Sequence, residues 1–149
     1  MQHSPKNEQQ KVTKFVIASI FYKDDTVLIA QRAKKDDLYG KWEFPGGKIE
    51  PGETEIECLV RELNEEFGIL AQVGDYVCSS FFEHKGSMVE MRAYMVPSYA
   101  GHMFLYDHLE VRWVKIEDLP SYDMPEPDAP IVERLLLEQR LGFPLISPS

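Results

Sequence analysis

The sequence has few cysteines and no long apolar run. Only 2 of its 149 residues are cysteine, Cys58 and Cys78, and two thiols make neither a disulfide framework nor a cysteine-rich metal site. We expect both to be free thiols in or near the core, in a reducing compartment. No stretch approaches the roughly 20 apolar residues of a membrane-spanning helix, so we expect no membrane association.

Basic residues are scarce as well. Lysine and arginine number 16 against 25 aspartates and glutamates, which gives a formal net charge of -9 at pH 7. Binding along a nucleic acid polymer requires clustered lysine and arginine, so this balance argues against such a partner. It leaves room for a small phosphorylated ligand, because a divalent cation can bridge acidic side chains to an anionic substrate.

The rest of the composition is that of one globular domain. Hydrophobic residues make up 44% of the chain and charged residues 28%, which suffices for one core at this length. Residues 1–11, MQHSPKNEQQK, are polar and lack the apolar run of a signal peptide. We therefore expect a disordered or frayed N-terminus over 1–11, a single domain over 12–149 and a cytoplasmic protein.

Segments rich in β-branched and aromatic residues predict strands. They cover 14–22, 26–32, 42–44, 71–83, 88–96 and 110–116, and Asp24 and Asp25 form a turn between the first two. Strands with one helix among them and another after them favour an α/β sandwich.

The first predicted helix has clear end signals. Thr54 and Glu57 fit a capping box at its start, and Gly68 is placed to end it in a left-handed conformation. The helical period predicts a buried stripe made of Ile56, Leu59, Val60, Leu63 and Phe67.

A second amphipathic helix is expected over 129–141. Its apolar residues Ile131, Leu135 and Leu136 should face the core. Asp128 stands directly before it, where an N-cap residue belongs.

The first helix carries an acidic edge. At about 100° per residue, Glu62, Glu65 and Glu66 fall along one flank of its apolar stripe. Like charges one turn apart repel, so the edge is either a solvated, salt-bridged surface or a cation site. The loop 45–47, Pro-Gly-Gly, favours the cation site. Glycine lets backbone carbonyls turn inward, and carbonyl and carboxylate oxygens are the ligands that Mg²⁺ prefers.

The same segment resembles the Nudix box. Gly47, Glu53, Arg61-Glu62-Leu63, Glu65-Glu66 and Gly68-Ile69 stand at the spacing of that box. The longer stretch LIAQRAKKDDLYGKWEFPGGKIEPGE is similar to the MutT-type branch of the family. The resemblance implies an α/β/α Nudix sandwich with a mixed central sheet and the box as a loop-helix-loop. It also implies a hydrolase of nucleoside diphosphates linked to another group, dependent on Mg²⁺ or, as a substitute, Mn²⁺.

The resemblance further implies roles for the box residues. It places metal ligands at the Gly47 carbonyl and at Glu62, Glu65 and Glu66. Glu53 would pair with Arg61 and hold the loop against the helix. Either Glu62 or Glu65 would be the general base that takes a proton from the attacking water, which leaves the catalytic set as Glu53, Arg61, Glu62 and Glu65.

Four further positions outside the box metal set are candidates, of which only Arg32 matches the family residue, while Asp107 and Asp128 depart from it. Asp107 stands where the branch carries a further metal-side glutamate, with Glu110 as a rival and a solvated loop acid as the alternative. Arg32 matches a nucleotide-contacting arginine and Lys48 is a candidate phosphate contact, with surface roles as the alternatives. Asp128 stands where relatives that read an oxidised guanine carry asparagine. An ionised aspartate only accepts hydrogen bonds, so it would pair with donors of guanine or cytosine.

The remaining aromatic residues and histidines receive structural interpretations. We expect Trp113 in the core and Trp42 in loop packing near the glycines. Phe81, Phe82 and Tyr94 are expected mostly to pack on the sheet, with base stacking as the alternative. His84, His102 and His108 fall in expected turns and are given no role.

These observations favour a metal-dependent enzyme that hydrolyses a ribo- or deoxyribonucleoside triphosphate to monophosphate and pyrophosphate. Its substrate would be an oxidised guanine nucleotide such as 8-oxo-dGTP, or a cytosine nucleotide. A Nudix pyrophosphatase for ADP-ribose, a nucleotide sugar or a dinucleoside polyphosphate is the alternative. A catalytically silent nucleotide-binding module is disfavoured because every box glutamate is present. The sequence leaves a monomer and a homodimer equally open.

Overall fold

The computed structural model describes residues 11–142. Residues 1–10 of the segment predicted to be frayed lie outside the described residues. Residues 143–149 of the predicted domain lie outside them as well. Within the described chain, no helix combines the length and the apolar character needed to cross a membrane. The elements are β1 (Val12–Lys23), β2 (Thr26–Arg32), β3 (Trp42–Glu43), β4 (Gly46–Lys48), α2 (Glu55–Phe67), β5 (Leu70–Gln72), β6 (Tyr76–His84), β7 (Ser87–Val96), β8 (Ser98–Ala100), β9 (His108–Lys115), the 3-10 helices η1 (Ile116–Ser121) and η2 (Glu126–Asp128), and α3 (Ala129–Leu141).

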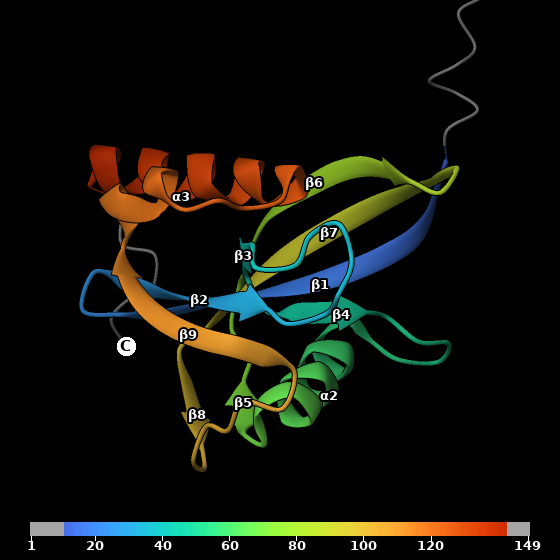
Figure 1. Ribbon diagram of the computed structural model, residues 1–149, viewed down its shortest axis with the longest axis horizontal. Coiled ribbons are helices and arrows are strands. Elements are labelled where there is room, and N and C mark those ends of the chain that lie inside the picture. Colours follow the sequence, from blue (N-terminus) through green and yellow to red (C-terminus); the bar gives the residue numbers. More distant parts are fainter. Residues whose placement is uncertain (1–10, 143–149) are drawn as a thin grey trace, which may run out of the picture.

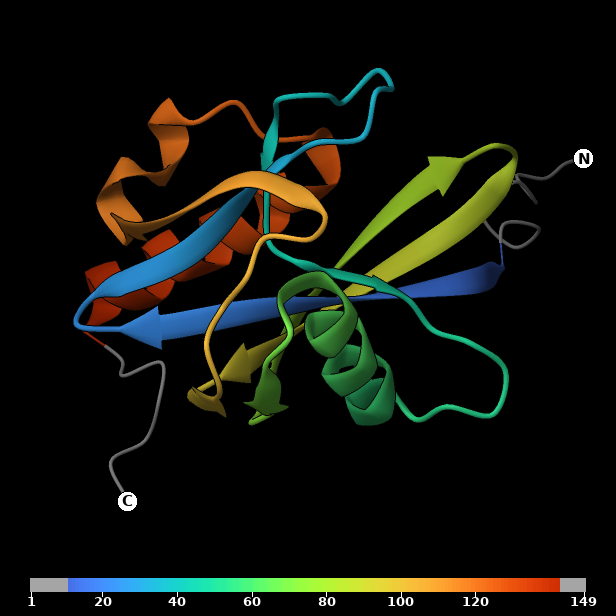
Figure 2. The ribbon, with the colours of Figure 1, turned by 60° about the horizontal axis from the view of Figure 1, so that its bottom comes forward.

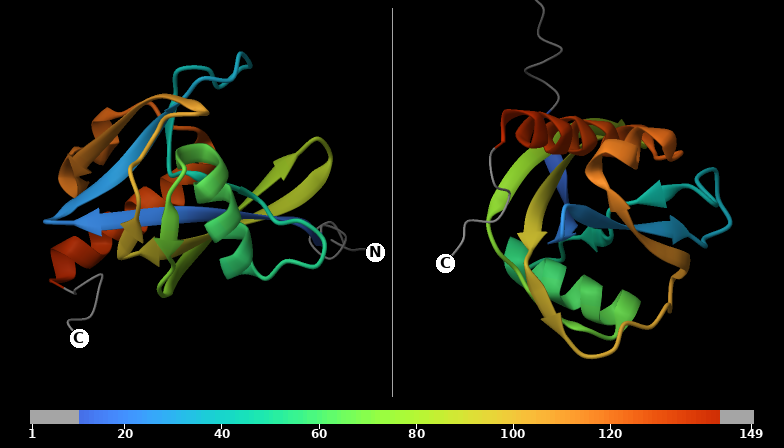
Figure 3. Two further views of the ribbon diagram at one scale, coloured as in Figure 1. Left: turned by 90° about the horizontal axis from the view of Figure 1, so that it is seen from below. Right: turned by 90° about the vertical axis from the view of Figure 1, so that its left-hand side faces the viewer.

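A mixed sheet forms the middle layer of the molecule (Figure 1). Its strands follow the order β3-β2-β1-β7-β6, while β4 pairs with β1 and β9 pairs with β2. The long strands β1 and β7 run parallel, and the other pairs of this sheet are antiparallel. Helix α2 covers one face and α3 the other (Figures 2 and 3). The predicted α/β sandwich with a mixed central sheet is therefore confirmed.

Each helix buries its own apolar cluster against the sheet. On the α3 side the cluster includes Ile20, Ile29, Met95, Ile131 and Leu135. On the α2 side it includes Ile17, Phe21, Leu59, Leu63 and Phe67. Strand β1 contributes to both clusters because successive side chains of a strand point to opposite faces. The sheet is thus fixed from both sides, which gives the loops at its edge a rigid support.

The first helix begins and ends where the sequence predicted. The Thr54 side chain accepts from the Glu57 backbone N–H and the Glu57 side chain accepts from the Thr54 backbone N–H, so the capping box is formed. Gly68 ends the helix with φ 72°. The predicted stripe is wrong at Ile56, which is 48% exposed. Ile56 is spaced to fall on the same side of the helix as Leu63, but it lines an open groove between the first turn of α2 and residues of β1 and β7.

The sheet differs from the predicted one at its irregular strands. The expected strand 71–83 is split into β5 and β6, because the Gly74 backbone N–H turns to the Met95 carbonyl at 2.7 Å. Strand β4 lies where the sequence predicts the loop 45–47, and β8 was not predicted. Both are 3 residues long and rich in glycine, serine or alanine, so they carry little strand signal.

Three aromatic residues lie elsewhere than expected. Trp113 is 39% exposed, because its strand β9 pairs with β2 alone among the described strands, and its ring meets Phe21 edge to face. Trp42 does more than pack in a loop. It is 8% exposed within the core cluster beside α3 and contacts Tyr122 edge to face. Phe81 is 59% exposed and does not fill the packing of the sheet.

Candidate active site

Two glycines let the loop before α2 lie against both neighbouring elements. A Cβ atom at Gly46 would lie 1.9 Å from the Ile17 carbonyl oxygen of β1. A Cβ atom at Gly47 would lie 2.2 Å from the carboxyl carbon of Glu62. A Cβ atom at Gly46 would clash with backbone, and one at Gly47 would require the Glu62 carboxylate to move. The pair of glycines therefore lets the backbone of β4 lie directly against the Glu62 carboxylate.

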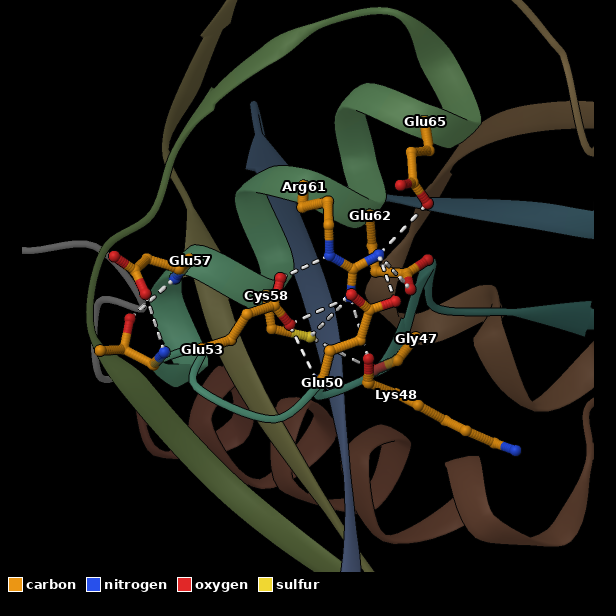
Figure 4. Close-up of polar contacts among 10 residues, drawn as sticks. Gly47, Lys48, Glu50, Glu53, Glu57, Cys58, Arg61, Glu62 and Glu65 are labelled. Atoms are coloured by element: carbon orange, nitrogen blue, oxygen red, sulfur yellow. Dashed lines mark hydrogen bonds and ion pairs between the residues drawn. The ribbon is translucent and has the colours of Figure 1, made fainter.

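Arg61 is the hub of the polar contacts at this loop (Figure 4). Its Nε and Nη2 donate to the two carboxylate oxygens of Glu53, the second bond measuring 3.1 Å. Its Nη1 donates to Glu62 at 3.1 Å and to Glu65 at 3.2 Å. Nη2 also donates to the Lys48 carbonyl at 3.1 Å. One guanidinium therefore ties the loop to two carboxylates of the helix.

Electrostatics keep this hub charged. The hydrogen bonds from Arg61, followed by the one from the Glu50 backbone N–H, hold the pKa of Glu53 below its usual range. The carboxylates in turn raise the pKa of Arg61, with Glu53 contributing most. Both partners stay ionised across the neutral range, so the contact acts as a permanent clamp.

Glu66 is in the opposite situation. It is 7% exposed, and its Oε1 has no hydrogen-bond partner among residues 11–142. Burial raises the pKa of Glu66 to about 10, and the neighbouring carboxylates of Glu62, Glu43 and Asp107 add to the shift. A buried acid surrounded by acids needs a positive charge to ionise at neutral pH. The position fits a cation ligand.

The donor set also fits a hard cation. Glu62, Glu65 and Glu66 offer carboxylate oxygens, and the Gly47 carbonyl faces α2, where the Cys58 thiol lies 3.7 Å away. In the described part of the chain these side chains do not form a preassembled cluster of three or more metal ligands, because Glu62 and Glu65 are turned to Arg61. Oxygen ligands with further positions left to water or phosphate are typical of Mg²⁺ sites.

A cleft of about 480 Å³ opens beside Glu66. It is lined by Arg32, Ala33, Lys34, Glu43, Gly46, Glu66, Tyr106, Asp107 and His108. The predicted acid Asp107 therefore lies beside Glu66. Its rival Glu110 instead accepts from Arg112 at 2.6 Å and does not line the cleft. The cleft therefore holds the carboxyl groups of Glu43, Glu66 and Asp107 together with the Arg32 guanidinium.

Arg32 is held in this cleft by two carboxylates. Its Nη1 donates to Glu43 at 3.0 Å and its Nη2 donates to Asp36 at 3.0 Å. The second oxygen of Glu43 lies 2.9 Å from His108 Nε2. A guanidinium held in this way presents a fixed charge to a phosphate or a base.

Asp128 is buried rather than capping α3. It is 2% exposed, its Oδ1 has no partner within the described chain, and its backbone is helical at φ -81° and ψ -14°. An N-cap residue needs an extended backbone for its side chain to reach the following N–H groups, so the predicted capping bond is wrong. Burial, and then the charge of Glu43, place the pKa of Asp128 well above its usual range, while Arg32 opposes the shift.

Comparison with known proteins identifies the family. The model of the NUDIX domain matches residues 12–135, which is more than half of the chain. The chain belongs to the Nudix family. Members of this family use divalent metal ions.

Related Nudix proteins match over most of their length. The chain is 39% identical over 121 residues to the CTP pyrophosphohydrolase of Escherichia coli, covering 81% of this chain and 90% of that protein. It is 33% identical over 112 residues to the 8-oxo-dGTP diphosphatase of Haemophilus influenzae, covering 75% and 82%. The solution structure of the E. coli ORF135 protein matches with a TM-score of 0.81 at 36% identity, covering 91% of this chain and 96% of that one.

The structure gathers most of the predicted site residues of this Nudix domain. The box residues Gly47, Glu53, Arg61, Glu62 and Glu65 form one contact network. Glu66, Asp107 and Arg32 line the adjoining cleft, and Asp128 lies within electrostatic reach of Arg32. Lys48 is the exception. Its carbonyl contacts Arg61, but its exposed side chain extends away from the network and does not line the cleft (Figure 4).

Sequence reasoning missed Glu43 and His108. Glu43 had a usable signal, since it is a lone carboxylate between Trp42 and Phe44 directly before the glycine loop. His108 had none, because its burial follows from the pairing of β9 with β2. Tyr94, a candidate for base stacking, lies in a separate groove and donates to Glu55.

Proposed function

We propose that this Nudix protein is a nucleoside triphosphate pyrophosphohydrolase that converts its substrate to a nucleoside monophosphate and pyrophosphate. One observation carries the proposal. Glu66 is a buried carboxyl group whose Oε1 has no hydrogen-bond partner among residues 11–142, and it lines the same cleft as the clamped guanidinium of Arg32. A metal–triphosphate complex requires one group that binds the metal ion and one that binds the phosphates. Glu66 and Arg32 supply these two groups at one cleft. The relatives named for CTP and 8-oxo-dGTP support the substrate class.

We assign metal binding to Gly47, Glu62, Glu65, Glu66 and Asp107, with Mg²⁺ as the ion and Mn²⁺ as a substitute. The bound ion would lower the pKa of the attacking water and neutralise charge on the leaving pyrophosphate. Either Glu62 or Glu65 would accept the proton of that water. The Glu53–Arg61 clamp would keep these carboxylates in place, and Arg32 would bind the nucleotide.

We assign base recognition to Asp128. Its raised pKa keeps the carboxyl neutral to higher pH than usual, and a neutral carboxyl group offers one donor and one acceptor. This is the pairing pattern of an amide. It matches the acceptor and amino donor on the edge of cytosine, or the carbonyl and N1–H on the edge of an oxidised guanine. We further propose that the enzyme acts on free nucleotides in the cytoplasm.

A turnover panel tests the proposal. The protein is assayed with Mg²⁺ for pyrophosphate release from the ordinary ribo- and deoxyribonucleoside triphosphates, 8-oxo-dGTP and 5-methyl-dCTP, with ADP-ribose as the control. We expect a preference of about a hundredfold for one base, because a buried polar group left unpaired discriminates strongly. Glu65→Gln is the matched control and should bind nucleotide with far slower turnover. Slow, uniform rates on all triphosphates with fast cleavage of ADP-ribose would contradict the proposal.

A further inference from the structure

His108 is a buried histidine that directly contacts the side chain clamping Arg32. Its side chain is 4% exposed, and its ring stacks on Phe67 with centroids 5.3 Å apart and planes 6° from parallel. Its Nε2 lies 2.9 Å from one oxygen of Glu43. A carboxylate only accepts hydrogen bonds, so Nε2 carries the hydrogen of this contact.

Glu43 is held at both of its oxygens. One oxygen contacts His108, and the other accepts from Arg32 Nη1 at 3.0 Å. A carboxylate fixed at one oxygen presents the other in a defined direction, so less rotamer freedom is lost when Arg32 docks on it. The three side chains thus form a chain of contacts along the cleft, from His108, which stacks on Phe67 of the core, to the Arg32 guanidinium.

A β-bulge brings this chain of contacts together. In the pairing of β2 with β9, Gln31 opposes Glu110 and Arg32 opposes His108, so Leu109 is an extra residue on β9. Bulges near active sites re-aim the side chains beside them. A regular ladder would place Leu109 opposite Arg32. The extra residue therefore sets His108 beside Arg32, at the place where both reach Glu43.

We propose that His108 is a positioning residue for substrate binding: it fixes Glu43 and, through Glu43, the Arg32 guanidinium in the cleft. The inference rests on the proposed function, since it takes Arg32 as a nucleotide ligand. It assigns the hydrogen bond, rather than the stacking on Phe67, as the contact that matters for the substrate. If His108 served only to fill the core, substrate binding would depend on the stacking of its ring on Phe67 and not on its hydrogen bond to Glu43.

Two variants separate these roles. His108→Phe keeps a ring on Phe67 and removes the donor, whereas His108→Gln keeps an N–H donor and removes the ring. We expect His108→Phe to raise the KM for the preferred triphosphate about tenfold with little change in kcat, as for a lost hydrogen bond to a charged group. His108→Gln should regain most of the lost affinity, although its Tm falls. The reverse order, with Gln the poorer variant in KM, would overturn the proposal.

A cycle with Glu43→Gln tests whether His108 acts through Glu43. In the Glu43→Gln background, His108→Phe should raise the KM by less than about twofold further, because the contact chain is already broken. Full additivity of the two effects would contradict the positioning role.

A readout on the free protein keeps this test separate from the identity of the substrate. Nitrogen NMR should show His108 as the Nε2–H tautomer. The Arg32 Nε–H signal, assigned with Arg32→Lys, should be well dispersed and slow to exchange, since this atom is buried. His108→Phe should broaden that signal or move it toward those of exposed arginines. An Nδ1–H tautomer, or an unchanged Arg32 signal, would overturn the inference even if the protein hydrolyses no triphosphate.

Discussion

Arg61 and Glu66 lie on the same helix, five positions apart, and have opposite electrostatic surroundings. Arg61 has acceptors on every side of its guanidinium, whereas Glu66 is buried with one oxygen unpaired among the described residues. The first contact is complete within the chain. The second requires a positive charge from outside, which is why we place Glu66 among the metal ligands and leave Glu53 and Arg61 as the clamp beside them.

Replacing Glu66 by glutamine tests this placement. The amide matches the neutral acid in shape, so Glu66→Gln should fold with a Tm close to that of the wild type in EDTA. Adding Mg²⁺ should raise the Tm of the wild type but not of the variant, because ligands stabilise the state that binds them. Pyrophosphate release should fall at least about a hundredfold. Glu83→Gln, on the exposed part of β6, is the control, and an equal Mg²⁺ response in both variants would exclude Glu66 as a ligand.

Asp128→Asn tests base reading through its pH dependence. The pKa of Asp128 is raised mainly by burial, so the neutral donor–acceptor form persists below that pKa and is lost as the pH rises through it. The KM of the wild type for its preferred nucleotide should therefore increase on the alkaline side. Asparagine keeps both groups at every pH, so the KM of the variant should stay flat. Parallel pH profiles for the two proteins would argue against this role.

At the scale of elements, the two loop glycines, Gly46 and Gly47, make different contacts. Replacing each by alanine should therefore affect a different property, stability for Gly46 and activity for Gly47. Gly46→Ala places a Cβ against the backbone of Ile17, which cannot move without disrupting β1. Gly47→Ala places it against the Glu62 side chain, which can rotate away. We expect Gly46→Ala to lower the Tm by several degrees, about the effect of overpacking a core. Gly47→Ala should keep most of its Tm and lose pyrophosphate release. Equal loss of Tm in both would contradict the distinct roles.

Elements with strong local signals were predictable from the sequence, and elements fixed by distant contacts were not. Helix α2 was predictable because its cap residues Thr54 and Gly68 act within one turn. The burial of Ile56 was predicted wrongly because its exposure depends on the open groove that the first turn of α2 forms with β1 and β7. Strand β4 was missed because its glycines carry no strand propensity, and the pairing with β1 supplies its hydrogen bonds instead.

At the scale of the molecule, the sequence predicted the box residues and only part of the cleft: it predicted Arg32, Glu66 and Asp107 but not Glu43 or His108. The box residues follow one another along a single loop and helix. The cleft brings together Arg32, Glu43 and His108 from three separate segments, and only the pairing of β2 with β3 and β9 places them side by side. Asp128 lies within electrostatic reach of Arg32 and Glu43. Asp128 illustrates the limit, since its sequence position suggested a cap while its surroundings make it a buried acid.

The two buried acids, Glu66 and Asp128, should also make the stability of the whole molecule depend on pH. The pKa of Glu66 is raised to about 10 and that of Asp128 is raised by burial, while both groups ionise near pH 4 in the unfolded chain. Between these limits the unfolded state binds fewer protons, so the free energy of unfolding falls as the pH rises. We expect the Tm in EDTA to fall by about 5 °C or more from about pH 6 to about pH 9.

The Tm could also fall with rising pH because the chain, with a net charge of -9 at pH 7, repels itself. Added salt distinguishes this repulsion from the effect of the buried acids. Added NaCl screens repulsion between exposed charges but acts much less on buried groups, so most of the slope should persist in about 0.5 M NaCl. Combining Glu66→Gln with Asp128→Asn should flatten the slope, because neither amide titrates. Mg²⁺ should restore the Tm of the wild type at alkaline pH, where ionised Glu66 can bind it. A slope that disappears in NaCl and is unchanged in the double variant would assign the effect to surface charge and leave Glu66 without the role proposed for it.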